Sequence, residues 1–386
     1  MRFEWTNVFA DIDPRLHRLM QRRRRGISTP PTASTEVGEV AAIALVNDLQ
    51  AWLSMSEVRE GAVLGNTPGG DIIVTARVPV SRLQSVRTSP CVVSLQASQT
   101  LQLARSNLTP QPPSLPGNGE NLNLTPQPPS LPGNGENLNL TPQPPSLPGN
   151  GENLKPLSLQ ERGLERGFLT KQQGKNAVVG IIDVGCDFVH QNFRHPDGST
   201  RILALWDQDG SSAPDSPFGY GKVYSSAEIN QALQAQDPYK ALGYHPGKYA
   251  HGTHVMDIAT GNGNGTGNSG MAPQADIVFV HFSTGAVEAV STNGNSAVDK
   301  SLGDTTELVE AVDLIFEIAG DRPCAINISL AMHGGPHDGT ALVEQSIDAL
   351  VEAKPNRAVV IAAGNSYYKG IHASGKVPKN GFTDLH

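Results

Sequence analysis

The sequence has few cysteines and no close pair of them. Cys91, Cys186 and Cys324 are the only three, and they lie far apart in the chain. An odd number of cysteines, with no Cys-x-x-Cys or Cys/His ligand spacing, predicts neither a disulfide framework nor a zinc site. We therefore expect no metal and no cofactor.

Long apolar runs are also missing. No apolar span reaches 18 residues, so no membrane helix is expected. Residues 1–5 lack the positive start and apolar core of a secretory signal. These two absences predict a cytoplasmic location and no membrane partner.

The chain has no excess of positive charge. Lys and Arg number 29 against 37 Asp and Glu, which gives a net charge of −8. This balance argues against a general nucleic-acid-binding protein. The one basic cluster, Arg22 to Arg25, is better explained as a solvated segment than as a nucleic-acid patch.

The first part of the chain predicts a lead segment and a small α+β domain. Residues 1–35 indicate a weakly structured lead that ends near a Pro-Pro pair. Within 36–106, β-rich runs and two helical spacings follow the order β-α-β-β-α-β, which is typical of a ferredoxin-like domain. An unrelated α+β module stays an alternative. The predicted strands are 40–46, 61–64, 71–78 and 91–95, and the predicted helices 48–53 and 80–86.

Residues 107–154 contain a perfect repeat. A 16-residue unit occurs three times, starting at Asn107, Asn123 and Asn139. Each copy has four prolines, two glycines and no apolar periodicity, so it does not bury a core. We interpret 107–154 as a semi-rigid Pro/Gly-rich linker.

Residues 155–386 show alternating strands and helices, which predict a parallel sheet covered by helices. The apolar run Ala177–Ile182 reads as a buried strand with Asp183 at its carboxyl end. His251 opens a helical stretch, and 208–250 looks like an insertion before it. The glycine-rich loop 261–270 has no carboxylates and no Gly-Lys-Ser/Thr ending, so we expect a plain loop. The other predicted strands are 201–207, 275–280, 324–330 and 358–363, and the other helices 305–319 and 340–353.

Three motifs in this order carry a family resemblance. They are Asp183-Val184-Gly185, the string from His251 to Val255 that reads His-Gly-Thr-His-Val, and the strand from Ala358 that ends in Ala-Ala-Gly-Asn at Asn365. Together they resemble the subtilisin-like serine peptidases (subtilases), whose triad follows the order Asp, His, Ser. The implied fold is a subtilisin-like parallel sheet flanked by helices, C-terminally incomplete, after a small ferredoxin-like α+β domain.

The resemblance implies a role for each motif. Asp183 would orient His251, His251 would act as general base, and Asn365 would stabilise the oxyanion. The strand Ser329, Leu330 and Ala331 would pair with an extended peptide. Ala362, Ala363 and Gly364 would wall the pocket for the residue before the scissile bond. His254 matches a structural position of the family and receives no catalytic role.

The fourth motif, a Gly-Thr-Ser-x-Ala segment with the nucleophilic Ser, is absent from these residues. Ser366 and Ser374 lack its context and lie close to Asn365. We therefore expect a subtilase domain over 155–386 that is truncated before the Ser segment. Val184, Met256-Asp257 and Ala331 also depart from the family pattern.

These observations lead to a hypothesis and two alternatives. The first is a serine-type endopeptidase by family that is inactive alone, with an extended peptide or protein as substrate and the 36–106 domain as an intramolecular inhibitor. The second is a non-catalytic peptide-binding or protease-inhibitory module. The third is one half of a split protease, completed by a chain that carries the Ser segment.

Overall fold

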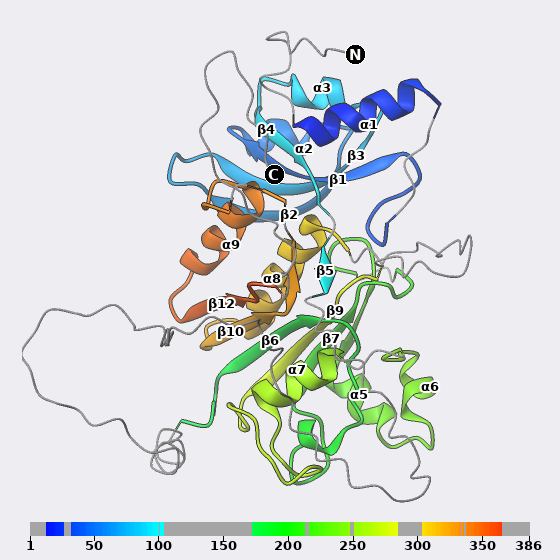
Figure 1. Ribbon diagram of the computed structural model, residues 1–386, viewed down its shortest axis with the longest axis vertical. Coiled ribbons are helices and arrows are strands. Elements are labelled where there is room, and N and C mark those ends of the chain that lie inside the picture. The colour runs from blue at the N-terminus through cyan, green and yellow to red at the C-terminus, as the bar shows by residue number, and fades with distance from the viewer. Residues whose placement is uncertain are drawn as a thin grey trace, which may run out of the picture. The chain divides into compact units, whose positions relative to one another are not determined.

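The structure is a computed structural model that describes residues 13–26, 32–99, 101–103, 172–212, 216–247, 251–284, 303–332, 334–335 and 337–364. Within these residues lie a four-stranded sheet and a six-stranded sheet (Figure 1). The three repeats of 107–154 and Asn365 fall outside the described residues. No helix in the described part of the chain is long and apolar enough to span a membrane.

The N-terminal domain has the predicted β-α-β-β-α-β order. Its sheet is antiparallel with strand order β2-β3-β1-β4. The elements are β1 (Glu39–Val46), α2 (Leu49–Leu53), β2 (Arg59–Asn66), β3 (Ile72–Pro79), α3 (Leu83–Arg87) and β4 (Val92–Ala97). A small antiparallel domain before the parallel sheet is therefore confirmed.

One face of this sheet is covered by its own helices. Trp52 of α2, Leu83 and Val86 of α3, and Leu16 of α1 (Pro14–Arg24) are buried in one cluster with β1, β3 and β4. Helix α1 lies in the stretch for which the sequence indicated a weakly structured lead. Its last turn and the residue after it carry the four exposed arginines.

The six-stranded sheet has the order β12-β10-β6-β9-β7-β8. All neighbouring strands are parallel except β7 and β8, which are antiparallel. The strands are β6 (Val178–Asp183), β7 (Ile202–Asp207), β8 (Lys222–Ser225), β9 (Asp276–His281), β10 (Cys324–Ile328) and β12 (Arg357–Ile361). The predicted parallel sheet with helices on its faces is confirmed.

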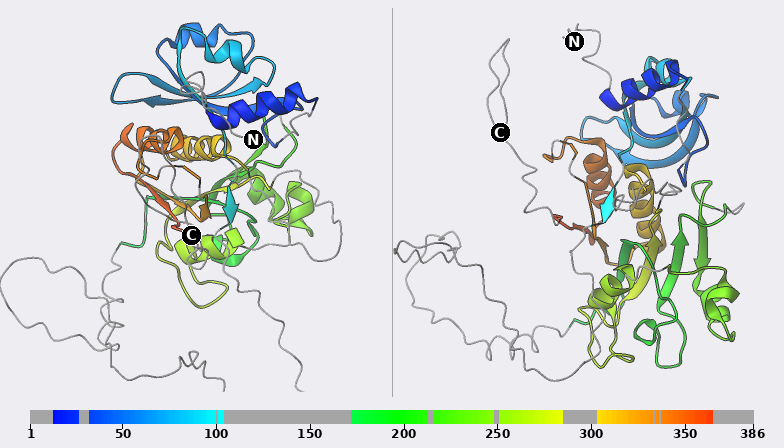
Figure 2. Two further views of the ribbon diagram at one scale, coloured as in Figure 1. Left: turned by 45° about the horizontal axis from the view of Figure 1, so that its top comes forward. Right: turned by 45° about the vertical axis from the view of Figure 1, so that its right-hand side comes forward.

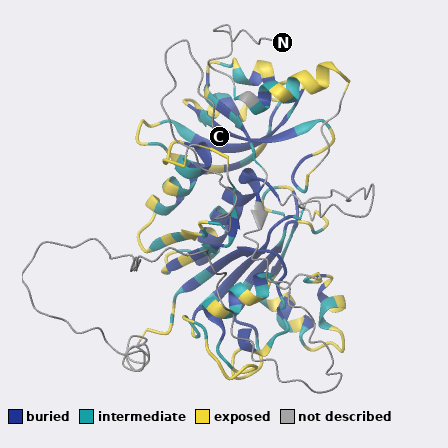
Figure 3. Ribbon diagram, in the orientation of Figure 1, coloured by how far each residue is buried: buried dark blue, intermediate teal, exposed yellow. Residues whose placement is uncertain are grey.

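Alternating side chains of the central strands bury both faces of this sheet. On β9, Val278 and Val280 belong to the cluster of α8 (Thr305–Ala319) and α9 (Leu342–Glu352). Ile277 and Phe279 instead belong to the cluster that includes Met256 of α7 (His251–Thr260). Burial on two faces explains why these strands read as continuous apolar runs in the sequence (Figure 3).

The stretch interpreted as an insertion has its own elements. It contributes the antiparallel strand β8, then α5 (Ser226–Ala232) and α6 (Pro238–Leu242). Ile229 of α5, Leu242 of α6 and Tyr244 are buried in the same cluster as α7. This segment is therefore part of the core on the α7 face of the sheet.

The second face of the N-terminal sheet packs on α8 and α9 (Figures 1 and 2). Ile43, Leu64 and Ile73 belong to the same buried cluster as these helices. The N-terminal domain also caps α8, since Ser98 Oγ accepts from Thr306 N at 3.1 Å and Gln99 O accepts from Thr305 N at 2.9 Å. The two sheets thus share one buried cluster, in addition to the cluster that each sheet has on its other face.

Candidate active site

Asp183 ends β6, at the edge of the sheet where ligands bind in open α/β folds. Its side chain is fully buried. Oδ1 accepts the backbone N–H of Val184 at 2.6 Å, whereas Oδ2 is a buried oxygen with no hydrogen-bond partner. The hydrogen bond from the neighbouring backbone N–H therefore holds the carboxylate in one orientation.

His251 is the first residue of α7, and its ring reaches Asp183. Its Nδ1 lies 2.7 Å from Asp183 Oδ1, and its side chain is 36% exposed. The hydrogen bond to Asp183 raises the pKa of His251 above its usual value, against the lowering effect of burial. Because a carboxylate only accepts, neutral His251 carries its proton on Nδ1 and leaves Nε2 free to take a proton.

The loop after Asp183 is bonded to the first turn of α7. Val184 O accepts from Gly252 N at 2.8 Å, and Gly185 O accepts from Thr253 Oγ1 at 3.1 Å. Thr253 Oγ1 also accepts from Asp187 N at 2.8 Å. These bonds fix the two segments that carry Asp183 and His251 relative to each other. No role for Thr253 was predicted from sequence.

The predicted substrate strand already has a partner from the same chain. Leu330 and Ala331 form β11, which pairs antiparallel with β5 (Gln102–Leu103), near the end of the 36–106 domain. Ser329 precedes β11, and its Oγ accepts from Asn327 Nδ2 at 3.0 Å. A two-residue strand carries no periodic signal, so β5 could not be predicted from sequence.

Ala362, Ala363 and Gly364 follow β12 at the same edge of the sheet. Ala362 N donates to Ile328 O at 3.0 Å, which continues the pairing of β12 with β10. Gly364 has φ of +91°, a value that favours glycine. The structure thus brings this stretch to the sheet edge that also carries Asp183, whereas the predicted oxyanion residue Asn365 is outside the described residues.

The loop 261–270, His254 and Asp257 belong to no metal centre in the described part of the chain. No group of three or more His, Cys, Asp or Glu side chains among the described residues could hold a metal ion. The loop 261–270 is closed by its own contacts, such as Gly270 N to Gly261 O at 2.7 Å. His254 is exposed on α7, and Asp257 accepts from Asn192 Nδ2 at 2.6 Å.

This arrangement agrees with the comparison with known proteins. Residues 174–380 match the sequence model of the subtilase family, which is more than half of the chain. The chain belongs to the subtilase family.

Individual relatives cover the same part of the chain. A PII-type proteinase of Lacticaseibacillus paracasei is 26% identical over 210 residues, which are 53% of this chain and 10% of that protein. The major intracellular serine protease of Bacillus subtilis (strain 168) is 27% identical over 197 residues, 50% of this chain and 44% of that protein. This chain thus matches less than half the length of these relatives. The solved CspB protease of Clostridium perfringens is 27% identical, with 52% of this chain and 39% of that chain covered and a TM-score of 0.42.

Proposed function

We propose that this chain provides the Asp–His part of a subtilisin-like serine endopeptidase site that acts on extended peptides or proteins. The observation that carries the proposal is the 2.7 Å contact between His251 Nδ1 and Asp183 Oδ1. In this role Asp183 holds the ring, and Nε2 of His251 removes the proton from an attacking serine hydroxyl and later passes it to the leaving amine. Asn365 would donate to the oxyanion.

We also propose that the 386 residues are inactive by themselves. They contain no Gly-Thr-Ser-x-Ala segment, so His251 has no nucleophile to activate. A triad without its nucleophile keeps only a small residual rate. A separate chain that brings the Ser segment would make this one half of a split protease.

Fluorophosphonate labelling of the purified chain tests this proposal. We expect no label that depends on His251, because the probe reacts with an activated serine. His251→Ala is the matched control for non-specific reaction. Stoichiometric labelling that disappears in His251→Ala would contradict the inactivity of the 386 residues, although it would support the role of His251.

A second candidate function is favoured by the pairing of β5 with β11. Since the chain's own residues occupy the strand expected to bind peptide, the N-terminal domain would act as an intramolecular inhibitor. In a non-catalytic binding or protease-inhibitory module, an external peptide would displace β5 and pair with the same strand.

Peptide-binding measurements distinguish this candidate. An extended fluorescent peptide should bind tightly and reversibly, and Ala331→Pro should abolish binding because proline removes a backbone donor from β11. Ala331→Ser keeps that N–H and serves as the control. Equal binding by both variants would exclude β11 as the binding strand.

A further inference from the structure

One tyrosine of the segment between β7 and α7 contacts the loop that follows Asp183. Tyr244 follows α6 and is buried against Phe188 and Tyr224. Its hydroxyl accepts from the backbone N–H of Cys186 at 3.0 Å and lies 2.8 Å from His281 Nδ1. Cys186 lies three residues after Asp183, so this hydroxyl binds directly to the loop that follows Asp183.

We propose that Tyr244 is a positioning residue for the Asp183–His251 pair. The inference rests on the proposed function, since it concerns how that pair is held. It assigns to the segment 208–250 a part in the active site, through a hydroxyl that bridges the Asp183 loop and β9.

The chemistry of the bridge fixes the direction of one of its two hydrogen bonds. The Cys186 N–H only donates, so the tyrosine oxygen accepts there, and its single proton is available to His281 Nδ1. When the proton is donated to Nδ1, His281 is neutral and carries its own proton on Nε2. Burial lowers the pKa of His281, which favours that neutral form. In this arrangement the tyrosine hydroxyl both accepts from Cys186 and donates to His281.

The bridge is placed where it can affect the geometry of the Asp183–His251 pair. Residue 281 pairs with Asp183 across β6 and β9, and Asp183 O accepts from Phe282 N at 2.9 Å. On its other side the Asp183 loop is bonded to Gly252 and Thr253 of α7. Tyr244 thus holds the loop from one side while α7 holds it from the other.

A second tyrosine of the segment supports the same loop. Tyr239 OH donates to Asp187 Oδ1 at 2.6 Å, and its ring lies edge-on to Phe188 with centroids 5.3 Å apart. The backbone N–H groups of Cys186 and Asp187 donate to the hydroxyls of Tyr244 and Thr253, respectively. Without Tyr244 the buried Cys186 N–H would lose its acceptor, and the loop would shift to find another.

The test compares Tyr244→Phe with Tyr224→Phe in the full 386-residue chain. Both variants remove one buried hydroxyl from the same aromatic cluster. Tyr224 OH donates to Gly243 O at 3.1 Å, outside the loop that follows Asp183. Two quantities are measured by nuclear magnetic resonance: hydrogen exchange at the Cys186 amide, and the pKa of His251 from its ring carbon signal. Neither requires enzymatic activity.

In Tyr244→Phe we expect the Cys186 amide to exchange about tenfold faster or more, which is the effect of losing one hydrogen bond. The pKa of His251 should fall toward the value of an unpaired imidazole, about 6.5. Tyr224→Phe should leave both quantities at their wild-type values. An equal fall of the His251 pKa in both variants, or no change in Tyr244→Phe, would overturn the proposal.

Two further measurements separate this proposal from the proposed function. If the Cys186 amide of the wild-type chain exchanges as fast as an exposed loop amide, the bridge is absent and the proposal fails without any variant. Asp183→Asn should lower the pKa of His251. If it does while Tyr244→Phe has no effect, only the positioning role is lost. If Asp183→Asn has no effect, the proposed function itself fails.

Discussion

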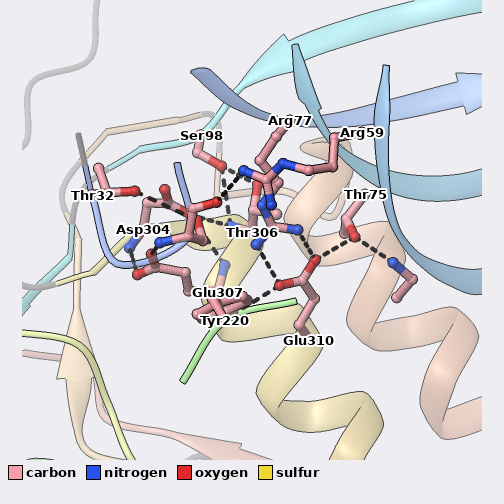
Figure 4. A network of polar contacts seen from close by, with 12 residues as sticks. Thr32, Arg59, Thr75, Arg77, Ser98, Tyr220, Asp304, Thr306, Glu307 and Glu310 are labelled. Carbon is pink, nitrogen blue, oxygen red and sulfur yellow. Dashed lines mark hydrogen bonds and ion pairs between the residues drawn. The ribbon is translucent and has the colours of Figure 1, made fainter. Parts of the chain in front are cut away.

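Arg77 of β3 and Glu310 of α8 form an ion pair in which both side chains are fully buried (Figure 4). Nη2 of Arg77 donates to Oε2 of Glu310 at 2.7 Å, and Nη1 donates to Oε1. Thr75 and Tyr220 also donate to this carboxylate. The pair joins the N-terminal domain to the subtilase domain at a point that water does not reach.

Removal of one partner of this pair should destabilise the whole described unit. Glu310→Ala leaves the buried guanidinium without its carboxylate, which costs about 3–5 kcal/mol. Urea unfolding of the full chain measures this loss. Arg322→Ala is the control, because its pair with Asp276 is about one-third exposed and contributes at most about 1 kcal/mol. Equal effects of the two changes would contradict the central role of the buried pair.

Gly252→Ala should weaken the contact between α7 and the Asp183 loop. An added Cβ would lie 2.7 Å from Phe279 Cζ, 2.8 Å from Gly185 O and 2.9 Å from Val184 O. Such overpacking costs about 1–3 kcal/mol and pushes His251 away from Asp183. Thermal unfolding measures the first effect and the pKa of His251 the second. Gly69→Ala, with its nearest atom 3.6 Å away, should change neither.

Arg201→Met should loosen the end of α7. The buried guanidinium of Arg201 donates to Thr260 O at 2.7 Å, Ala275 O at 2.6 Å and Asn192 O at 3.1 Å. Methionine fills the space without a donor, so several carbonyls stay buried and unpaired, at a cost of about 3 kcal/mol or more. Urea unfolding checks this value. A loss below about 1 kcal/mol would show that water replaces the guanidinium.

The Asp183–His251 pair should make stability depend on pH. Because the pKa of His251 is raised in the folded chain, the protonated ring is favoured by folding. This stabilisation is fully present below about pH 6.5, the pKa of the unfolded side chain, and is lost as pH rises through the folded pKa. Unfolding midpoints measured across this range should show the slope, and Asp183→Asn should flatten it. His254→Gln, a change at an exposed neighbour, should keep the slope.

The order of most elements could be predicted because local patterns determine it, whereas α1, β5 and the elements of the 208–250 segment were not predicted. The run before Asp183 is apolar and β-branched, and the residues from Thr305 to Ala319 show helical spacing. The contacts between distant segments could not be predicted. Arg77 stands on a strand where a charged residue suggests a solvent-facing side chain, and its partner lies 233 residues further on. Tyr244 likewise lies in a segment with no recognised motif.

In the candidate site, too, some features could be predicted from sequence and others could not. Asp183 and His251 carry a family motif, so their pairing could be expected from sequence. The occupation of β11 by Gln102 and Leu103 could not, because backbone pairing of two residues leaves no pattern in the side chains. Asn365 stays a prediction.

The most direct measurement is whether neutral His251 carries its proton on Nδ1. A nuclear magnetic resonance spectrum of the wild-type chain with labelled histidine should show this proton far downfield, as expected for a hydrogen bond to a carboxylate. The signal should vanish in His251→Ala and in Asp183→Asn, and persist in His254→Gln. A wild-type spectrum that places the proton of neutral His251 on Nε2 would contradict the account, because Nε2 could then not take a proton and the unprotonated Nδ1 would face the Asp183 carboxylate.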